Sequence, residues 1–129
     1  MSTEQKFLIN CQNGANDVER ATISFILAVT ASKTAETAVF ISAEASRLCC
    51  RGGSDNLIAE GYESLKSLIG AFLANGGHIW LCPACAKAKD ISEADLMTGL
   101  LAAYASSCAP EAMNAIVRGA PAISAPSMR

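Results

Sequence analysis

Two cysteines in this sequence are spaced for sulfur chemistry. Cys82 and Cys85 form a Cys-x-x-Cys motif in the segment WLCPACA, residues 80–86. We expect a strand to end at Cys82 and a helix to begin at Pro83, which is tolerated at a first helical position. The helix dipole and the free N–H groups there favour a thiolate, the form of cysteine that attacks sulfur. Cys82 is therefore the predicted nucleophile, and Cys85 is close enough to attack a sulfur species bound to it.

Other functions of this pair stay open. A structural zinc site needs four ligands, and the chain has no second Cys-x-x-Cys and no His-x-x-x-His motif. Zinc at Cys82 and Cys85 would therefore need a site shared between subunits. The pair could also act as a thiol-disulfide oxidoreductase, or could pack as small hydrophobic side chains.

The other four cysteines, taken singly, are predicted to be buried as small hydrophobic residues. The first of them ends the first expected strand and could approach the same sheet edge as Cys82. A vicinal pair could lie on a loop that covers this edge. The four residues are Cys11, Cys49, Cys50 and Cys108.

No other polar residue has a clear catalytic role in the sequence. His78 is the only histidine, and four residues of strand separate it by about 13 Å from Cys82 within the same strand. It is therefore not expected to act as the base for Cys82. The segment 13–17 could open a phosphate site, but it lacks a Gly-x-Gly-x-x-Gly or Gly-Lys-Ser/Thr motif and is predicted to be a turn with a helix cap.

Composition limits the class of protein. The chain has 129 residues, which is enough for one domain, predicted over residues 1–129. It is 51% hydrophobic and 17% charged with a formal net charge of −2, which argues against intrinsic disorder and against nucleic acid as a partner. No apolar stretch approaches about 18 residues, and the N-terminal residues do not resemble a signal peptide. We therefore expect a cytoplasmic protein that does not enter a membrane and whose thiols stay reduced.

The order of elements predicts how these cysteines are positioned. Continuous apolar runs favour parallel strands that are covered on both faces. The segments between these runs have apolar residues at helical spacing, which predicts helices. Asn16 followed by Glu19 is typical of a helix N-cap. The pattern predicts an α/β fold of three layers, with a mostly parallel, doubly wound sheet of about five strands flanked by helices. The expected strands are 6–11, 37–42, 78–82, 100–104 and 120–124, and the expected helices are 17–33, 43–50, 62–75, a helix after Pro83, and 110–117.

Over nearly its whole length, the chain resembles the DsrE/DsrF-like (DsrEFH-like) family of small sulfur-relay proteins. The resemblance depends on the order and spacing of several short segments. These are Gly14-x-Asn16-Asp17 with Arg20-Ala21, the Val39–Ile41 strand, Leu65-x-x-Leu68-Ile69 before Gly76-Gly77, Ile79–Ile91, Leu96-x-x-Gly99, and the final helix and strand.

The resemblance implies a doubly wound fold that assembles into homo-oligomers (dimer, trimer or hexamer) or hetero-hexamers. In sulfur-transferring members, a cysteine at the end of this strand carries a persulfide from a donor protein to an acceptor protein, and Cys82 matches that position. The chain departs from the family at Cys85, and at Lys89-Asp90, where Arg-Gly is frequent. The expected function is a sulfurtransferase-like persulfide carrier without cofactor or bound metal. The alternative is a non-catalytic oligomeric binding or sensor protein of the same fold.

Overall fold

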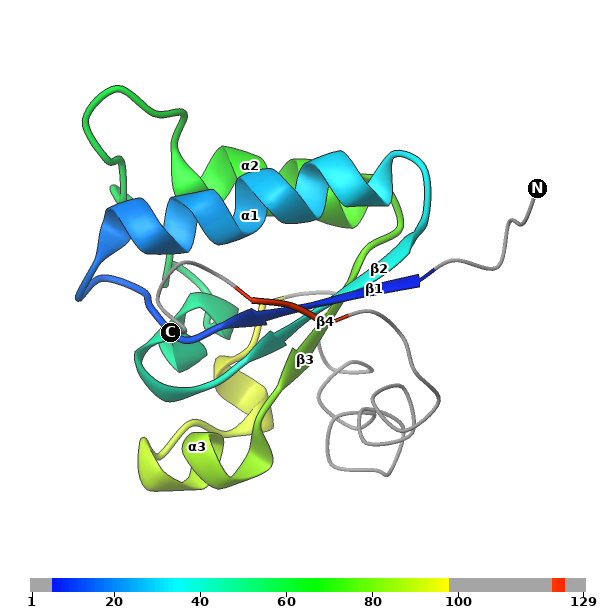
Figure 1. Cartoon of the computed structure of the whole chain (residues 1–129). Helices are drawn as coiled ribbons and strands as arrows, with labels where there is room; N and C mark the ends of the chain where they lie inside the picture. The colour runs from blue at the N-terminus through cyan, green and yellow to red at the C-terminus, as the bar shows by residue number, and fades with distance from the viewer. Residues whose placement is uncertain (1–5, 98–121, 125–129) are drawn as a thin grey trace.

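A parallel sheet forms the centre of the computed structural model, which describes residues 6–97 and 122–124 (Figure 1). Four described strands lie in the order β3-β2-β1-β4, and every neighbouring pair is parallel. Because the register pairs Cys11 with Ile41 and Ile41 with Leu81, three strands end side by side at one edge. The strands are β1 (Lys6–Cys11), β2 (Glu36–Ile41), β3 (His78–Leu81) and β4 (Ala122–Ser124).

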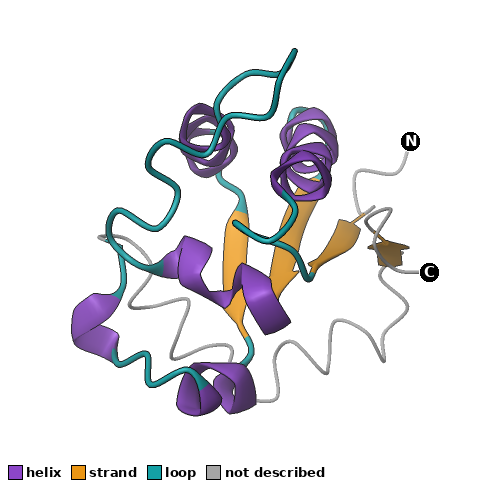
Figure 2. Cartoon of the chain, turned by 90° about the vertical axis from the view of Figure 1, so that its left-hand side faces the viewer, coloured by secondary structure: helices purple, strands orange, loops and turns teal. Residues whose placement is uncertain are grey.

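Helices connect these strands and lie on both sides of the sheet. The two long helices run together over one face, whereas α3 lies on the other side, next to the carboxyl end of β3 (Figures 1 and 2). A short 3-10 helix, η1, follows β2 at the same edge. The helical elements are α1 (Val18–Ser32), η1 (Ala43–Cys49), α2 (Leu65–Ala74), α3 (Pro83–Ala88) and η2 (Glu93–Asp95).

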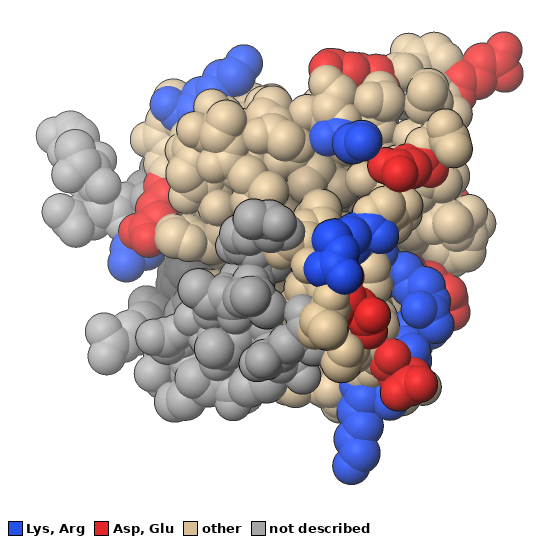
Figure 3. Space-filling view, turned by 180° about the vertical axis from the view of Figure 1, so that it is seen from behind, with Lys and Arg blue, Asp and Glu red and all other residues tan. Residues whose placement is uncertain are grey.

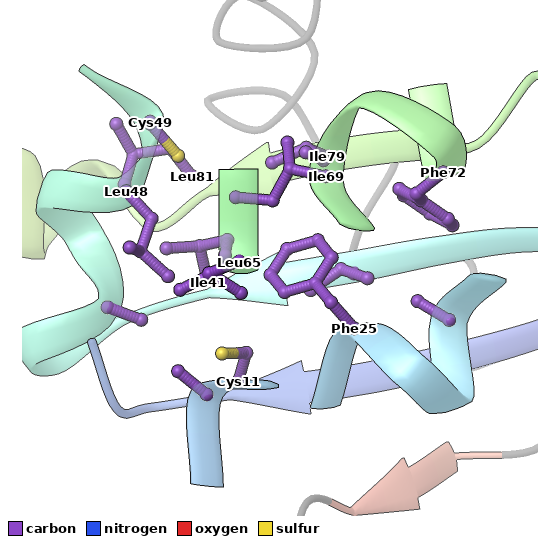
Figure 4. Packing of buried hydrophobic residues seen from close by; sticks show 14 of the residues in the cluster. Cys11, Phe25, Ile41, Leu48, Cys49, Leu65, Ile69, Phe72, Ile79 and Leu81 are labelled. Atoms are coloured by element: carbon purple, nitrogen blue, oxygen red, sulfur yellow. The ribbon is translucent and has the colours of Figure 1, made fainter. Parts of the chain in front are cut away.

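The hydrophobic core lies between the sheet and the two long helices (Figure 4). Alternate strand residues point toward α1 and α2, as the period of two along a strand requires. Between the helices, the Phe25 and Phe72 rings meet edge to face, with centroids 6.0 Å apart. The strand residues in this core are Ile9, Cys11, Val39, Ile41, Ile79 and Leu81.

The structure confirms an α/β fold with a parallel sheet flanked by helices. The predicted strand 100–104 and helix 110–117 lie outside the described residues, so the described sheet has four strands. The strand expected over 120–124 is described as Ala122–Ser124. No helix in the described part of the chain is both long and apolar enough to cross a membrane.

Two helix starts differ from the prediction. Asp17, not Asn16, caps α1, and its carboxylate accepts a hydrogen bond from the Arg20 N–H. Asn16 is engaged within the loop, because its side-chain oxygen accepts the Gly14 N–H at 2.9 Å. The helix expected from residue 62 begins instead at Leu65. Ser64 caps it by accepting a hydrogen bond from the Ser67 N–H.

Candidate functional site

Cys82 lies where β3 meets α3, as predicted. The Cys82 N–H donates to the Ile41 carbonyl at 2.8 Å, which extends the pairing of β2 and β3 by one hydrogen bond. Cys82 is also the N-cap of α3, whose first helical residue is Pro83. Cys82 and Cys85 are both free thiols and both half-buried. The Cys82 sulfur is thus not sealed inside the core, and a second thiol lies one helical turn away.

Cys85 contacts a backbone amide from a distant part of the chain. The N–H of Ala43, the first residue of η1, donates to Cys85 Sγ at 3.2 Å. Ala43 has φ of 54°, in the left-handed region that non-glycine residues adopt infrequently. This residue joins β2 to η1, so the loop after the neighbouring strand supplies a hydrogen-bond donor to the Cys-x-x-Cys pair.

Two further contacts hold η1 against α3. The Arg47 guanidinium donates to the Lys89 carbonyl at 3.2 Å, which satisfies a backbone oxygen at the end of the helix. The Lys89 ammonium lies 3.3 Å from the Glu44 carboxylate. These contacts join the two elements at the end of α3 that lies away from Cys82.

The pKa of Cys82 is raised above the usual value for a thiol, and burial is the main cause. Its hydrogen bond and charge interaction with the Cys85 side chain raise it further, whereas the amides of Cys85 and Ala84 oppose the shift. The amides at this helix terminus therefore favour the Cys82 thiolate, as expected, but burial and the Cys85 side chain outweigh them. With six residues, α3 has few aligned peptide dipoles, and two amide donors do not offset the loss of solvent.

The pKa of Cys82 is expected to fall in a Cys85→Ala variant. This substitution removes the thiol that raises the pKa but keeps the amide of residue 85, which lowers it. The rate of Cys82 alkylation, measured by peptide mass against pH, should then have its midpoint at a lower pH than in the wild-type protein. An unchanged or higher midpoint would show that the Cys85 side chain does not raise the pKa of Cys82.

Two of the other cysteines belong to the core rather than to this site. Cys11 and Cys49 are buried (Figure 4), and burial raises the pKa of both thiols. Cys11 lies two strands from Cys82, a separation of about 10 Å across the sheet. The predicted burial of these two residues is confirmed, and neither contributes to the pair.

Cys50 is half-buried, and burial also raises the pKa of its thiol. It pairs with Leu96 in an isolated antiparallel bridge. Cys50 therefore resembles Cys82 in exposure and in the direction of its pKa shift, but it has no second thiol one helical turn away. Cys108 lies outside the described residues.

The remaining polar candidates lie elsewhere. His78 begins β3, at the far end of that strand from Cys82, and its Nε2 is 3.4 Å from the Glu36 carboxylate. Glu19 accepts a hydrogen bond from the Tyr62 hydroxyl at 3.0 Å. Within residues 6–97 and 122–124, no three His, Cys, Asp or Glu side chains are grouped so that they could hold a metal ion. In the view of Figure 3, basic and acidic side chains are interspersed.

The Ala43 amide is the part of this site that the sequence did not predict. Alanine carries no signal for a left-handed backbone conformation, which glycine and asparagine adopt more readily. The contact also joins residues 42 positions apart in the chain. A short helix after β2 was predicted, but its approach to α3 depends on tertiary packing.

The fold and the geometry of the site define an α/β protein with a dithiol at the carboxyl edge of a parallel sheet. Among solved structures, the chain is similar to the YchN protein from E. coli, which has a DsrE/DsrF-like fold. That structure has a TM-score of 0.70 and 19% sequence identity, and the match covers 93% of this chain and 98% of the other. The chain therefore shares this fold. No protein-family model matches the sequence, and no curated protein does.

Proposed function

We propose that this protein is a small intracellular sulfur carrier in which Cys82 accepts a sulfane sulfur as a persulfide. The main support is the placement of Cys82, half-exposed at a strand end beside the second free thiol of Cys85. The DsrE/DsrF-like fold, which occurs in sulfur-relay proteins, supports the same function. Its partners would be a sulfur donor protein, a sulfur acceptor protein and further copies of this chain, in a reducing cytoplasm.

Loading is a thiolate displacement at sulfur. The Cys82 sulfur, once deprotonated, attacks the terminal sulfur of a donor persulfide. A bond forms between Cys82 Sγ and that sulfur, the sulfur–sulfur bond of the donor breaks, and the donor leaves as a thiolate. Because the pKa of Cys82 is raised, little of the thiol is ionised before the encounter. Its proton passes to solvent before the attack, and the donor thiolate that leaves takes up a proton afterwards.

Two outcomes are available to the loaded protein. In transfer, an acceptor thiolate attacks the terminal sulfur and Cys82 leaves as a thiolate, whose charge the amides of Ala84 and Cys85 stabilise. In resolution, the Cys85 sulfur attacks Cys82 Sγ and releases the extra sulfur as sulfide. The neighbouring thiol therefore limits how long a persulfide persists without an acceptor.

Intact mass after incubation with a low-molecular-weight persulfide tests this function. We expect the wild-type protein to gain the mass of one sulfur atom, or to lose two hydrogens after resolution, and Cys82→Ser to show neither change. Cys50→Ser is the matched control, because Cys50 is also half-buried with a raised pKa. If Cys82→Ser gains sulfur as readily as the wild-type protein, the carrier function is wrong and a non-catalytic role becomes the better description.

A further inference from the structure

We propose that Ala43 is a positioning residue of the dithiol site. Its left-handed backbone aims the amide N–H at Cys85 Sγ and stabilises negative charge on that sulfur when Cys85 resolves the persulfide on Cys82. The inference rests on the proposed carrier function for the resolving step. The interaction between the amide and the sulfur can be measured without that function.

The conformation of Ala43 is the first observation behind this role. A left-handed backbone costs an alanine free energy because Cβ approaches the following carbonyl oxygen. Strained backbone conformations persist where contacts with the surrounding structure hold them in place, and they cluster at functional sites. The Ala43 side chain is exposed, so its packing does not explain the conformation. The contact that the conformation does provide is the 3.2 Å hydrogen bond to Cys85 Sγ.

The second observation is that the amide is held on both sides. Before it, the Ser42 N–H donates to the Cys11 carbonyl at 3.1 Å, so the chain leaves the sheet at a fixed point. After it, η1 is joined to the end of α3 through Arg47 and Lys89. The donor is thus pre-organised, and little reorganisation is needed when charge develops on Cys85.

Resolution of the Cys82 persulfide by Cys85, the step in which this amide acts, needs no external oxidant. The Cys85 thiolate attacks Cys82 Sγ, and a bond forms between the two Sγ atoms. The bond from Cys82 Sγ to the sulfane sulfur breaks. That sulfur leaves with the electron pair and takes up the proton that Cys85 has lost, so it is released as hydrosulfide. The two cysteines are oxidised to a disulfide, and the sulfane sulfur is reduced. A hydrogen bond from Ala43 favours the thiolate that begins the step.

A series of substitutions at residue 43 tests the role in a Cys82→Ser background, where no sulfur transfer takes place. Gly and Asn accept a left-handed backbone, whereas the β-branched Val resists it. We expect alkylation of Cys85 by iodoacetamide near pH 8, followed by peptide mass, to be about tenfold slower in Ala43→Val and within about twofold of the parent in Ala43→Gly and Ala43→Asn.

Equal rates near pH 8 in all four proteins would overturn the proposal. A slow Asn variant would also overturn it, because the substitution would then act through the bulk of the side chain rather than through the backbone conformation. Failure of sulfur loading in the wild-type protein would instead overturn the carrier function and leave these rates unaffected.

Hydrogen exchange supplies a second measurement that does not depend on a variant of residue 43. In Cys85→Ala, the Ala43 amide should exchange about tenfold faster than in the wild-type protein, because its acceptor is gone. The Ser42 amide is the internal control, since its acceptor is the Cys11 carbonyl and stays in place. Equal exchange of the Ala43 amide in both proteins would show that the sulfur is not its acceptor.

Discussion

A Cys85→Ala variant loaded with sulfur is expected to retain it, whereas the wild-type protein releases it as sulfide. Cys85 lies one helical turn after Cys82, and its side chain interacts with that thiol. Attack within such a pair benefits from effective molarities far above those of thiols in solution. Without this nucleophile, sulfide release in the absence of added thiol should fall at least ~100-fold.

Sulfide can be measured by colorimetric assay after the persulfide donor has been removed by gel filtration. Cys50→Ala is the matched control and should release sulfide like the wild-type protein, because Cys50 lies outside the pair. Equal release from Cys85→Ala and the wild-type protein would contradict the resolving role of Cys85. In that case, the thiol next to Cys82 would not consume the persulfide.

The largest expected loss of stability follows replacement of Phe72 by alanine. The ring is fully buried, and it packs edge to face against Phe25 of α1. Gly77 lies directly against it, because a Cβ at that residue would be 2.3 Å from the ring. Truncation of a buried phenylalanine in a packed core costs about 3–5 kcal/mol, and we expect a loss in this range in the free energy of unfolding.

Urea unfolding followed by circular dichroism measures this loss. Gly70→Ala is a suitable control on the same helix, because residue 70 is exposed and a Cβ there meets no atom within 4 Å. The control should keep or slightly raise the free energy of unfolding, since alanine is the better helix former. A loss below about 1 kcal/mol in Phe72→Ala would show that this ring does not anchor the core.

Most of the fold was predictable because local patterns and tertiary packing agree. The continuous apolar runs correctly identified β1, β2 and β3 as parallel strands, and helical spacing identified α1 and α2. The helix starts were less predictable because neighbouring polar residues compete for the same cap. Asn16 and Asp17 are both good N-caps, and a loop hydrogen bond to Gly14 engages the first of them.

The placement of the site was predictable to the same degree, but its electrostatics were not. A strand followed by Cys-Pro-x-Cys correctly located Cys82 at the edge of the sheet and Cys85 one turn later. The direction of the Cys82 pKa shift depends on burial and on the Cys85 thiol, neither of which can be read from spacing. The donor at Ala43 depends on tertiary contact and leaves no pattern in the chain.

The most direct test of the carrier function is to locate the added sulfur. Cys85→Ala protein, loaded with a persulfide donor and then capped with an alkylating reagent, can be digested and its cysteine peptides weighed. We expect one extra sulfur atom on the peptide that contains Cys82 and none on those that contain Cys50 or Cys108. Extra sulfur on either of those peptides, with Cys82 carrying only the alkyl group, would contradict this expectation.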